Sequence, residues 1–419
     1  MHRRAAVTRR AALLACLAAP TTLRAAPDEA LLGAQQGYPR GTAQDWFYNE
    51  RVRVGSFSHQ AEIAGILNGG LHELAAAVVP RPLPRVPRAP PVRWRGVDGM
   101  SRNLDDYLDR QRVMGLMLLR DGEVLLERYQ YERQAADRFV SHSMAKGIVS
   151  LGVGLALQEG RIASLDDRAE RYAPRLRRTL YGQTRLRNLL RMGSGARFSE
   201  NYDGHDDFSR FGRMALREGL EDAAVLVDQR IAPEGTRFNY ASPEAPMLGA
   251  ALRGATGQSL AEYLTPRLWQ AMGAERSALW HTDRTGLESG AGHFNACLRD
   301  YARLGALLAD DGWRADTATQ VLPRDYLLQA TDWHRHDAPF QPGHAHSIFG
   351  YGYHFWTFPS EARRFAMLGV FGQLIFVDPE LKLVMVQTAA DASPDTAGSH
   401  LFEEALAVWR GLVAYHGRW

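Results

Sequence analysis

The pattern of apolar and polar residues along the chain first becomes regular near residue 112. Two runs rich in apolar residues, Arg112–Leu119 and Glu123–Tyr131, flank the dipeptide Asp121-Gly122. Asp-Gly between two such runs is a strong signal for a β-hairpin, because both residues tolerate positive φ. The next segment, Ser143–Gly160, is apolar over most of its length and polar only at its end. The pattern therefore predicts a hairpin followed by a buried helix.

Three further apolar runs and an amphipathic segment lie near the C-terminus. We predict strands over Tyr351–Phe358, Arg364–Phe376 and Leu381–Thr388, the last two joined at Asp378-Pro379-Glu380. His400–Tyr415 has the spacing of an amphipathic helix, and the middle of the chain, to about residue 330, is mostly helical in pattern. Strands at both ends with helices between them predict an α+β fold. One antiparallel sheet is then built from both ends of the domain around a helical insertion.

The first 92 residues differ from the rest. Residues 27–79 show no clean period, and residues 80–92 (PRPLPRVPRAPPV) contain six prolines, which is typical of an extended linker or a wrapping arm. A folded domain is therefore expected to begin near Trp94. We divide the chain into residues 1–26, an N-terminal extension with a proline-rich linker over residues 27–92, and a main domain over residues 93–419.

Residues 1–26 have the features of an export signal. A basic start (MHRRAAVTRR) precedes a short apolar stretch and the small residues Ala25 and Ala26, which suit a cleavage site. Arg9-Arg10 followed by an apolar run resembles a twin-arginine signal, so we expect a periplasmic or secreted protein. Leu13–Cys16 resembles a lipoprotein cleavage box, but few apolar residues precede it. After cleavage near Ala26 only Cys297 remains, which excludes an intramolecular disulfide.

The net charge gives no indication of a nucleic-acid partner. The whole chain has a formal charge of +3, but residues 1–26 contain five arginines and no acidic residue, so the remainder has about −2. A large basic face is therefore not expected. No segment is long and apolar enough for stable membrane insertion.

Arginine supplies almost every basic residue, and only Lys146 and Lys382 are lysines. Lys146 lies three residues after Ser143, so the two lie on one face at the start of the predicted helix. A lysine amine can lose its proton when buried, whereas a guanidinium cannot. A neutral amine beside a hydroxyl is the arrangement that activates a serine nucleophile. The simpler alternative is a helix-capping serine followed by an ordinary helical lysine.

Two later motifs extend this one. Tyr240-Ala241-Ser242 lies about a hundred residues downstream, and Gly369-Val370-Phe371-Gly372-Gln373 lies in a predicted late strand. Together with Ser143-x-x-Lys146, they resemble the three motifs of the class C β-lactamase-like serine hydrolases, and most closely the branch of the 6-aminohexanoate-dimer hydrolases. The resemblance covers roughly residues 95–415 and implies the β-lactamase/transpeptidase-like fold.

The resemblance assigns roles to the matched residues. It implies that Ser143 is the nucleophile and that Lys146 and Tyr240 manage the proton. A nearby ammonium would lower the pKa of the phenol and make Tyr240 the base, whereas a neutral Lys146 could take the proton itself. Both options remain open at the level of sequence. The backbone N–H groups of Ser143 and Val370 are the expected oxyanion hole.

The third motif departs from the Lys-Thr-Gly of β-lactamases and penicillin-binding proteins. No lysine precedes Gly369, and Lys382 lies beyond the next turn. This loss disfavours a β-lactam, whose carboxylate the lysine would hold, and favours amides or esters. Arg363 or Arg364 could substitute for the missing cation.

Further substrate contacts are expected by resemblance, each with a structural alternative. Tyr202 is either a loop residue that closes on substrate or a solvent-facing turn residue, Asn295 is either a substrate contact or a helix cap, and the glycines serve either substrate binding or close packing. The complete set of expected substrate-binding residues is Tyr202, Ser242, Asn295, Gly369 and Gly372.

A group of histidines near the C-terminus does not suggest a metal site. No carboxylate or cysteine at a matching spacing accompanies them, and the surrounding residues are typical of a surface loop. The group consists of His334, His336, His344, His346 and His354. No metal and no cofactor are expected.

The sequence therefore predicts an exported serine hydrolase that cleaves a small-molecule amide or ester through an acyl-enzyme on Ser143. One alternative is a true β-lactamase or D-alanyl peptidase. Another is a catalytically silent sensor of the penicillin-binding type. The sequence does not give the natural substrate or the oligomeric state.

Overall fold

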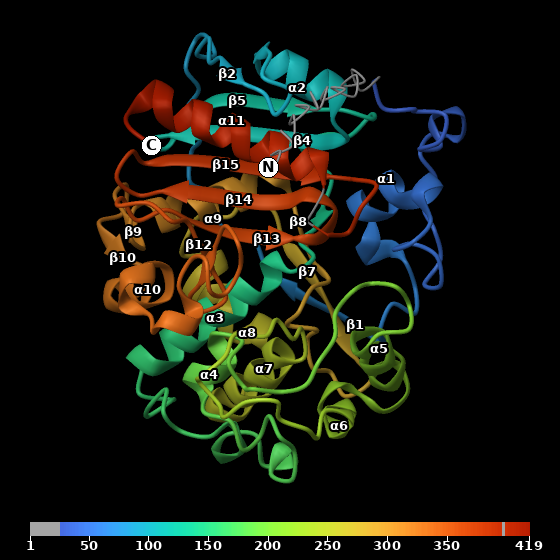
Figure 1. The fold of residues 1–419 in the computed structure, drawn as a ribbon, viewed down its shortest axis with the longest axis vertical. Coiled ribbons are helices and arrows are strands. Elements are labelled where there is room, and N and C mark those ends of the chain that lie inside the picture. The colour runs from blue at the N-terminus through green and yellow to red at the C-terminus, as the bar shows by residue number, and fades with distance from the viewer. Residues whose placement is uncertain (1–25, 396–398) are drawn as a thin grey trace, which may run out of the picture.

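The computed structural model describes residues 26–395 and 399–419, so the predicted export signal lies outside the described residues except for Ala26. Its largest element is a seven-stranded antiparallel sheet (Figure 1). The strands in spatial order are β11 (Gly350–Tyr351), β12 (Trp356–Thr357), β13 (Phe365–Gly369), β14 (Gln373–Asp378), β15 (Leu383–Ala389), β4 (Val113–Arg120) and β5 (Glu123–Tyr129). Strands from both ends of the domain thus share one sheet, which confirms the predicted α+β architecture.

Successive side chains of the central strands point to opposite faces of this sheet. On β14 and β15, Ile375 and Val384 belong to the core under one face, whereas Phe376 and Met385 belong to the core under the other. Helix α11 (His400–His416) covers the second face, and α3 (Met144–Gln158) and α9 (Leu298–Ala309) pack against the first (Figure 1). Because both faces are covered, β13, β14 and β15 are buried at every position and are mostly apolar.

The predicted hairpin is confirmed, but two of the predicted C-terminal strands are wrong. Asp121 and Gly122 have φ of 51° and 77°, as a tight turn between β4 and β5 requires. The predicted strand Tyr351–Phe358 is divided into β11 and β12, with His354 at φ 61° between them. Likewise Arg364–Phe376 contains β13, a turn at Val370–Gly372 and the start of β14. An apolar run hides such reversals, because strands covered on both faces carry no polar alternation.

A smaller sheet, two short hairpins and further helices complete the fold. The four-stranded sheet, which the sequence did not predict, consists of β1 (Asn68–Leu74), β7 (Ala278–Asp283), β8 (Phe294–Ala296) and β6 (Phe139–Val140). Two short hairpins pair β2 (Trp94–Arg95) with β3 (Ser101–Arg102) and β9 (Trp313–Arg314) with β10 (Thr319–Gln320). The remaining helices are α1 (Glu50–Ser58), α2 (Leu104–Arg110), α4 (Leu186–Leu190), α5 (Asp207–Glu218), α6 (Leu220–Ala223), α7 (Glu244–Thr256), α8 (Leu260–Leu264) and α10 (Arg324–Thr331). Within the described ranges, none of the helices has the length and apolarity needed to cross a membrane.

The N-terminal extension is an integral part of this domain. It contributes α1 and β1, and Trp46, Phe57 and Leu67 are buried in the same core as α3. The proline-rich segment runs along β5, where the Val86 N–H donates to the Val124 carbonyl at 3.1 Å. Of the two interpretations of residues 80–92, the structure therefore supports the wrapping arm, and residue 93 does not mark a boundary in the core.

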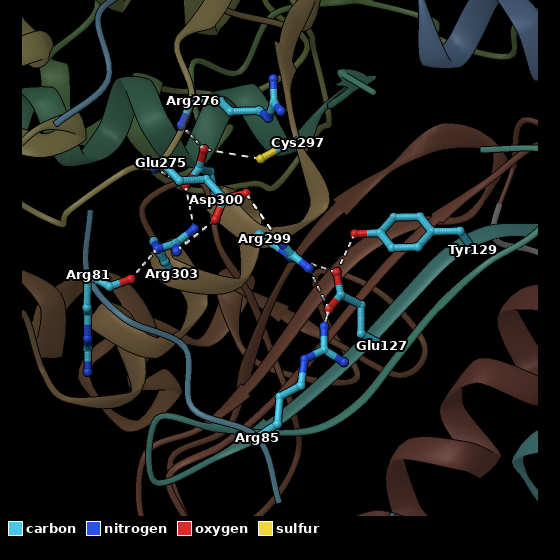
Figure 2. A network of polar contacts seen from close by, with 10 residues as sticks. All are labelled: Arg81, Arg85, Glu127, Tyr129, Glu275, Arg276, Cys297, Arg299, Asp300 and Arg303. Atoms are coloured by element: carbon cyan, nitrogen blue, oxygen red, sulfur yellow. Dashed lines mark hydrogen bonds and ion pairs between the residues drawn. The ribbon is translucent and has the colours of Figure 1, made fainter. Parts of the chain in front are cut away.

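Ion pairs to one buried carboxylate hold this arm in place (Figure 2). Glu127 on β5, whose side chain is 3% exposed, pairs with Arg85 of the arm and with Arg299 of α9, whose Nε lies 2.8 Å from Oε1. The Tyr129 hydroxyl donates to the same carboxylate at 2.7 Å. One carboxylate thus connects the arm, the sheet and a helix.

Candidate active site

Ser143 and Lys146 lie at the N-terminus of α3. Nζ of Lys146 is 2.7 Å from Oγ of Ser143, so the one-turn spacing places the two groups in direct contact. The Ser143 side chain makes no capping hydrogen bond to the helix, and the capping-serine alternative is therefore not supported. The positive end of the helix dipole favours negative charge on this oxygen and disfavours a cation beside it.

The amine of Lys146 is buried inside the protein. The residue is 1% exposed, because α3 runs through the core with nearly all of its side chains buried. Burial lowers the pKa of Lys146 to about 8, and the nearby Glu200 carboxylate acts in the opposite direction. A lysine with this pKa is partly neutral at neutral pH and can accept a proton.

Tyr240 lies just before α7 and faces the same amine. Nζ of Lys146 is 4.9 Å from the centroid of the Tyr240 ring, which stacks on Trp356 at 5.7 Å. Burial raises the pKa of the Tyr240 phenol above its usual value, Glu200 raises it further, and a hydrogen bond with Ser143 lowers it. Burial therefore favours the protonated form of the Tyr240 phenol. The two bases left open by the sequence are therefore distinguished: Lys146 is suited to accept a proton, and Tyr240 to donate one.

Two backbone N–H groups are available next to the serine hydroxyl. Ser143 and Val370 both line the cavity described below, and neither N–H donates a hydrogen bond to any residue that the structure describes. Val370 begins the turn between β13 and β14, where the ladder of the sheet ends. A substrate carbonyl oxygen could accept from both groups, as an oxyanion hole requires.

The two glycines of this motif have a packing role instead of the expected contact with substrate. A Cβ on Gly369 would lie 2.5 Å from the Ser141 carbonyl oxygen, and one on Gly372 would lie 2.6 Å from the Leu401 side chain. Neither glycine lines the cavity. Of the two interpretations of Gly369 and Gly372, close packing is therefore the one that the structure supports.

Glu200 is a member of the site that the sequence did not indicate. Its carboxylate accepts from the Tyr202 hydroxyl at 2.7 Å, from the Ser242 hydroxyl at 2.6 Å and from the Ser242 N–H at 2.8 Å. These contacts bring the predicted substrate-binding residues Tyr202 and Ser242 together at the cavity wall. A glutamate in a loop with no motif gives no sequence signal, and only its position beside Lys146 and Tyr240 makes it relevant.

A cavity of about 410 Å³ opens from Ser143. Residues of α5 and of the N-terminal extension both line it. The extension contributes Gln44, Trp46, Phe47, Tyr48 and Leu67. Trp46 also stacks on His142, the residue before the serine, with ring centroids 5.9 Å apart. Residues 27–92 therefore help to build the site.

Comparison with known proteins identifies the family. The β-lactamase family model matches residues 100–408, which is most of the chain. The chain belongs to the β-lactamase family. This membership and the names of its relatives make it a serine hydrolase with the β-lactamase/transpeptidase-like fold.

Relatives of this β-lactamase-family chain include hydrolases with other names. The 6-aminohexanoate-dimer hydrolase of Paenarthrobacter ureafaciens is 26% identical over 337 residues, which cover 78% of this chain and 85% of that protein. The solved structure named "Putative 6-aminohexanoate-dimer hydrolase from Bacillus anthracis" has a TM-score of 0.78 at 22% identity, covering 89% of this chain and 96% of that chain. EstCE1, a hydrolase with promiscuous acyltransferase activity, has a TM-score of 0.55 at 16% identity, covering 72% and 95%.

This member of the β-lactamase family has no cation where Lys-Thr-Gly would place one. Lys382 lies in the turn between β14 and β15, where its Nζ is 3.0 Å from the Ala309 carbonyl oxygen. Arg364 is buried and pairs with Asp378, while Arg363 pairs with Asp311. None of the three lines the cavity. The two arginines considered as substitutes for the missing lysine are therefore engaged elsewhere.

Asn295 lies away from this site. It is buried in β8, its Nδ2 donates to Gln60 Oε1 at 3.1 Å, and it neither lines the cavity nor caps a helix. Its placement gives no support to the expected substrate contact. The expected loop of histidines also differs in part, because His336 and His354 are buried. In the described part of the chain, no three His, Cys, Asp or Glu residues form a group suited to a metal ion.

Proposed function

We propose that this chain hydrolyses amide or ester bonds of small molecules through an acyl-enzyme on Ser143. The observation that carries the proposal is the 2.7 Å contact between Lys146 Nζ and Ser143 Oγ, in a site where burial lowers the pKa of the lysine to about 8. A neutral amine at this distance can take the hydroxyl proton as the oxygen attacks a carbonyl carbon.

The neighbouring groups supply the remaining steps. The N–H groups of Ser143 and Val370 stabilise the oxyanion of the tetrahedral intermediate. Tyr240, kept protonated by burial, donates a proton to the leaving nitrogen or oxygen and regains it from the Lys146 ammonium. Water then attacks the acyl-enzyme, again with Lys146 as base. All of these steps use groups of the chain itself.

The substrate class rests on both chemistry and relatives. Relatives named 6-aminohexanoate-dimer hydrolase support an amide substrate, and EstCE1 supports acyl transfer. A β-lactamase or D-alanyl peptidase is disfavoured, because no cation lies where a β-lactam carboxylate would be held. A silent sensor is disfavoured, because Ser143, Lys146 and Tyr240 form a complete proton-transfer arrangement.

We also propose that the protein is exported to the periplasm or secreted. The support is the basic, apolar and small-residue pattern of residues 1–26, with Arg9-Arg10 suggesting the twin-arginine route. Cell fractionation of the wild type and of an Arg9→Lys/Arg10→Lys variant tests this.

Intact mass spectrometry tests the hydrolase mechanism. The protein is incubated with p-nitrophenyl esters, a linear amide and a fluorophosphonate probe. We expect a mass increase equal to the acyl or phosphonyl group on the wild type and none on Ser143→Ala. Labelling of both proteins to the same extent would overturn the proposal.

A further inference from the structure

We propose that the substrate carries an uncharged aliphatic chain, and that this chain lies against α5 and the N-terminal extension during catalysis. The inference rests on the proposed function and adds the substrate class. The cavity that would receive the chain begins at Ser143 and is continuous with the proposed reaction centre.

The wall on α5 is an apolar stripe. Phe208, Phe211, Ala215 and Leu216 all line the cavity, and their spacing of three, four and one residues places them on one face of the helix. Trp46, Phe47 and Leu67 of the N-terminal extension line the same cavity, as do Pro243 and Pro246. A chain in this cavity would contact carbon atoms of these residues.

The charge of the lining argues against a charged chain. Glu200 and Arg213 are its acidic and basic side chains. The Glu200 carboxylate is occupied by Tyr202 and Ser242, and Arg213 is exposed and donates to the Gly204 carbonyl at 3.1 Å. The two lining histidines are neutral, because burial lowers the pKa of His142 well below its usual value and that of His293 to about 3. An ammonium on the chain would therefore be desolvated without a free partner, and a carboxylate could pair only with the exposed Arg213.

Gly212 leaves open space in the α5 wall. It lines the cavity between Phe211 and Arg213, and a Cβ built on it would meet no heavy atom within 4 Å. Every other position of the stripe named above carries a side chain. A larger residue at position 212 would therefore start in open space at the cavity lining, beside the volume assigned to the aliphatic chain.

The wild-type protein should therefore discriminate by chain length. With p-nitrophenyl esters from acetate to octanoate, kcat/KM should rise by up to about fourfold per methylene, as expected for burial of one CH₂ group, until the cavity is full. A second series, acetate esters of alcohols from methanol to octanol, shows whether the chain belongs to the acyl group or to the leaving group. A rise in either series supports the proposal, and two flat profiles overturn it.

Gly212→Leu tests the location. We expect the ratio of octanoate to acetate kcat/KM to fall at least tenfold, because the leucine side chain takes volume that only the longer acyl chain needs. Leucine is a better helix former than glycine, so α5 should not be weakened. Gly70→Leu is the matched control, because a Cβ there also meets no atom within 4 Å and Gly70 does not line the cavity. Its ratio should equal that of the wild type.

The outcomes separate this inference from the proposed function. If the wild type turned over no ester and Ser143 could not be acylated, the proposed function would fail. If the wild type turned over acetate esters but the octanoate-to-acetate ratio of Gly212→Leu equalled that of the wild type, only the inference would fail. Loss of both activities by the same factor in Gly212→Leu would also overturn the assigned location.

Discussion

At the scale of single residues, the site depends on opposing effects on one amine. Burial removes water from Lys146 and favours its neutral form, whereas Glu200 favours the ammonium. Burial is the larger effect, and the pKa of about 8 leaves the lysine able to change charge near neutral pH. Tyr240 experiences the same burial with the opposite consequence, because an anionic phenolate is the form that desolvation disfavours.

Ser143→Ala should abolish turnover. The substitution removes the only atom proposed to form the acyl bond and, because the side chain makes no cap, should not unfold α3. We expect esterase kcat to fall by about 10⁴-fold or more, with an unchanged circular dichroism spectrum. Ester hydrolysis within tenfold of wild type would exclude Ser143 as the nucleophile.

Lys146→Arg should be as damaging as Lys146→Ala. A guanidinium cannot act as a base, so each variant should lose about 10²–10⁴-fold in kcat/KM. In the wild type, protons occupy the amine below its pKa, so kcat/KM should rise with pH and level off near pH 8. The measurement is the pH profile of p-nitrophenyl acetate hydrolysis. Retention of most activity by Lys146→Arg would reassign the base.

Glu200→Gln should move this acidic limb to lower pH. The charge of the Glu200 carboxylate raises the pKa of Lys146. Neutralising Glu200 removes this effect, so the pKa of Lys146 should fall further. Ser242→Ala is the control, because it removes a hydrogen bond to Glu200 but keeps the charge. The same pH profile is measured for both variants. A limb that stays in place or moves upward in Glu200→Gln would show that Glu200 does not act on the amine.

At the scale of elements, the end of one strand determines which substrates can be held. The chain reverses at Val370–Gly372 between β13 and β14, and Val370 lines the same cavity as Ser143. β13 itself contributes only apolar residues and Gly369. The end of β13 therefore keeps the backbone N–H donor of the third motif but lacks the lysine of Lys-Thr-Gly.

Nitrocefin should consequently be a poor substrate. In the part of the chain that the structure describes, Arg363, Arg364 and Lys382 are engaged elsewhere and cannot bind the β-lactam carboxylate. An ester needs only the serine, its base and the N–H groups. We expect kcat/KM for nitrocefin at least tenfold below that for p-nitrophenyl butyrate on one preparation. A nitrocefin value of about 10⁶ M⁻¹s⁻¹ or more, high in the usual enzyme range, would instead indicate a β-lactamase.

At the scale of the whole molecule, the N-terminal extension both lines the cavity and is attached to the rest of the domain by ion pairs. Its first half contributes the lining residues, and its proline-rich arm is fixed to β5 and α9 through Glu127 (Figure 2). The Arg303 side chain also donates to the Arg81 carbonyl at 2.9 Å. Residues 27–92 thus contribute both to the stability of the protein and to the shape of the cavity. They lie before residues 100–408, which the family model matches.

Glu127→Ala should destabilise the protein without changing its chemistry. Removing this buried carboxylate leaves Arg85, Arg299 and Tyr129 without their common partner. Both arginines reach water, so we expect a loss of about 2 kcal/mol in urea unfolding, below the ~3–5 kcal/mol of fully buried pairs. Asp166→Ala, which breaks the exposed pair with Arg187, should cost ~1 kcal/mol or less. Equal effects of the two variants would contradict the role of Glu127.

The sequence alone determined the local geometry of this protein. A spacing of three residues in an apolar helix placed Lys146 against Ser143, Asp121-Gly122 produced a hairpin, and three ordered motifs indicated the family, because each depends on neighbours in the chain. The tertiary structure decided the rest. Glu200 lies near the amine only because of the tertiary fold, and the chain reverses at Val370 instead of continuing as a strand. Asn295 lies within a strand, and the N-terminal extension lines the site. The apolar pattern predicted a buried helix, but the charge state of Lys146 also depends on Glu200, which only the tertiary structure brings near the amine.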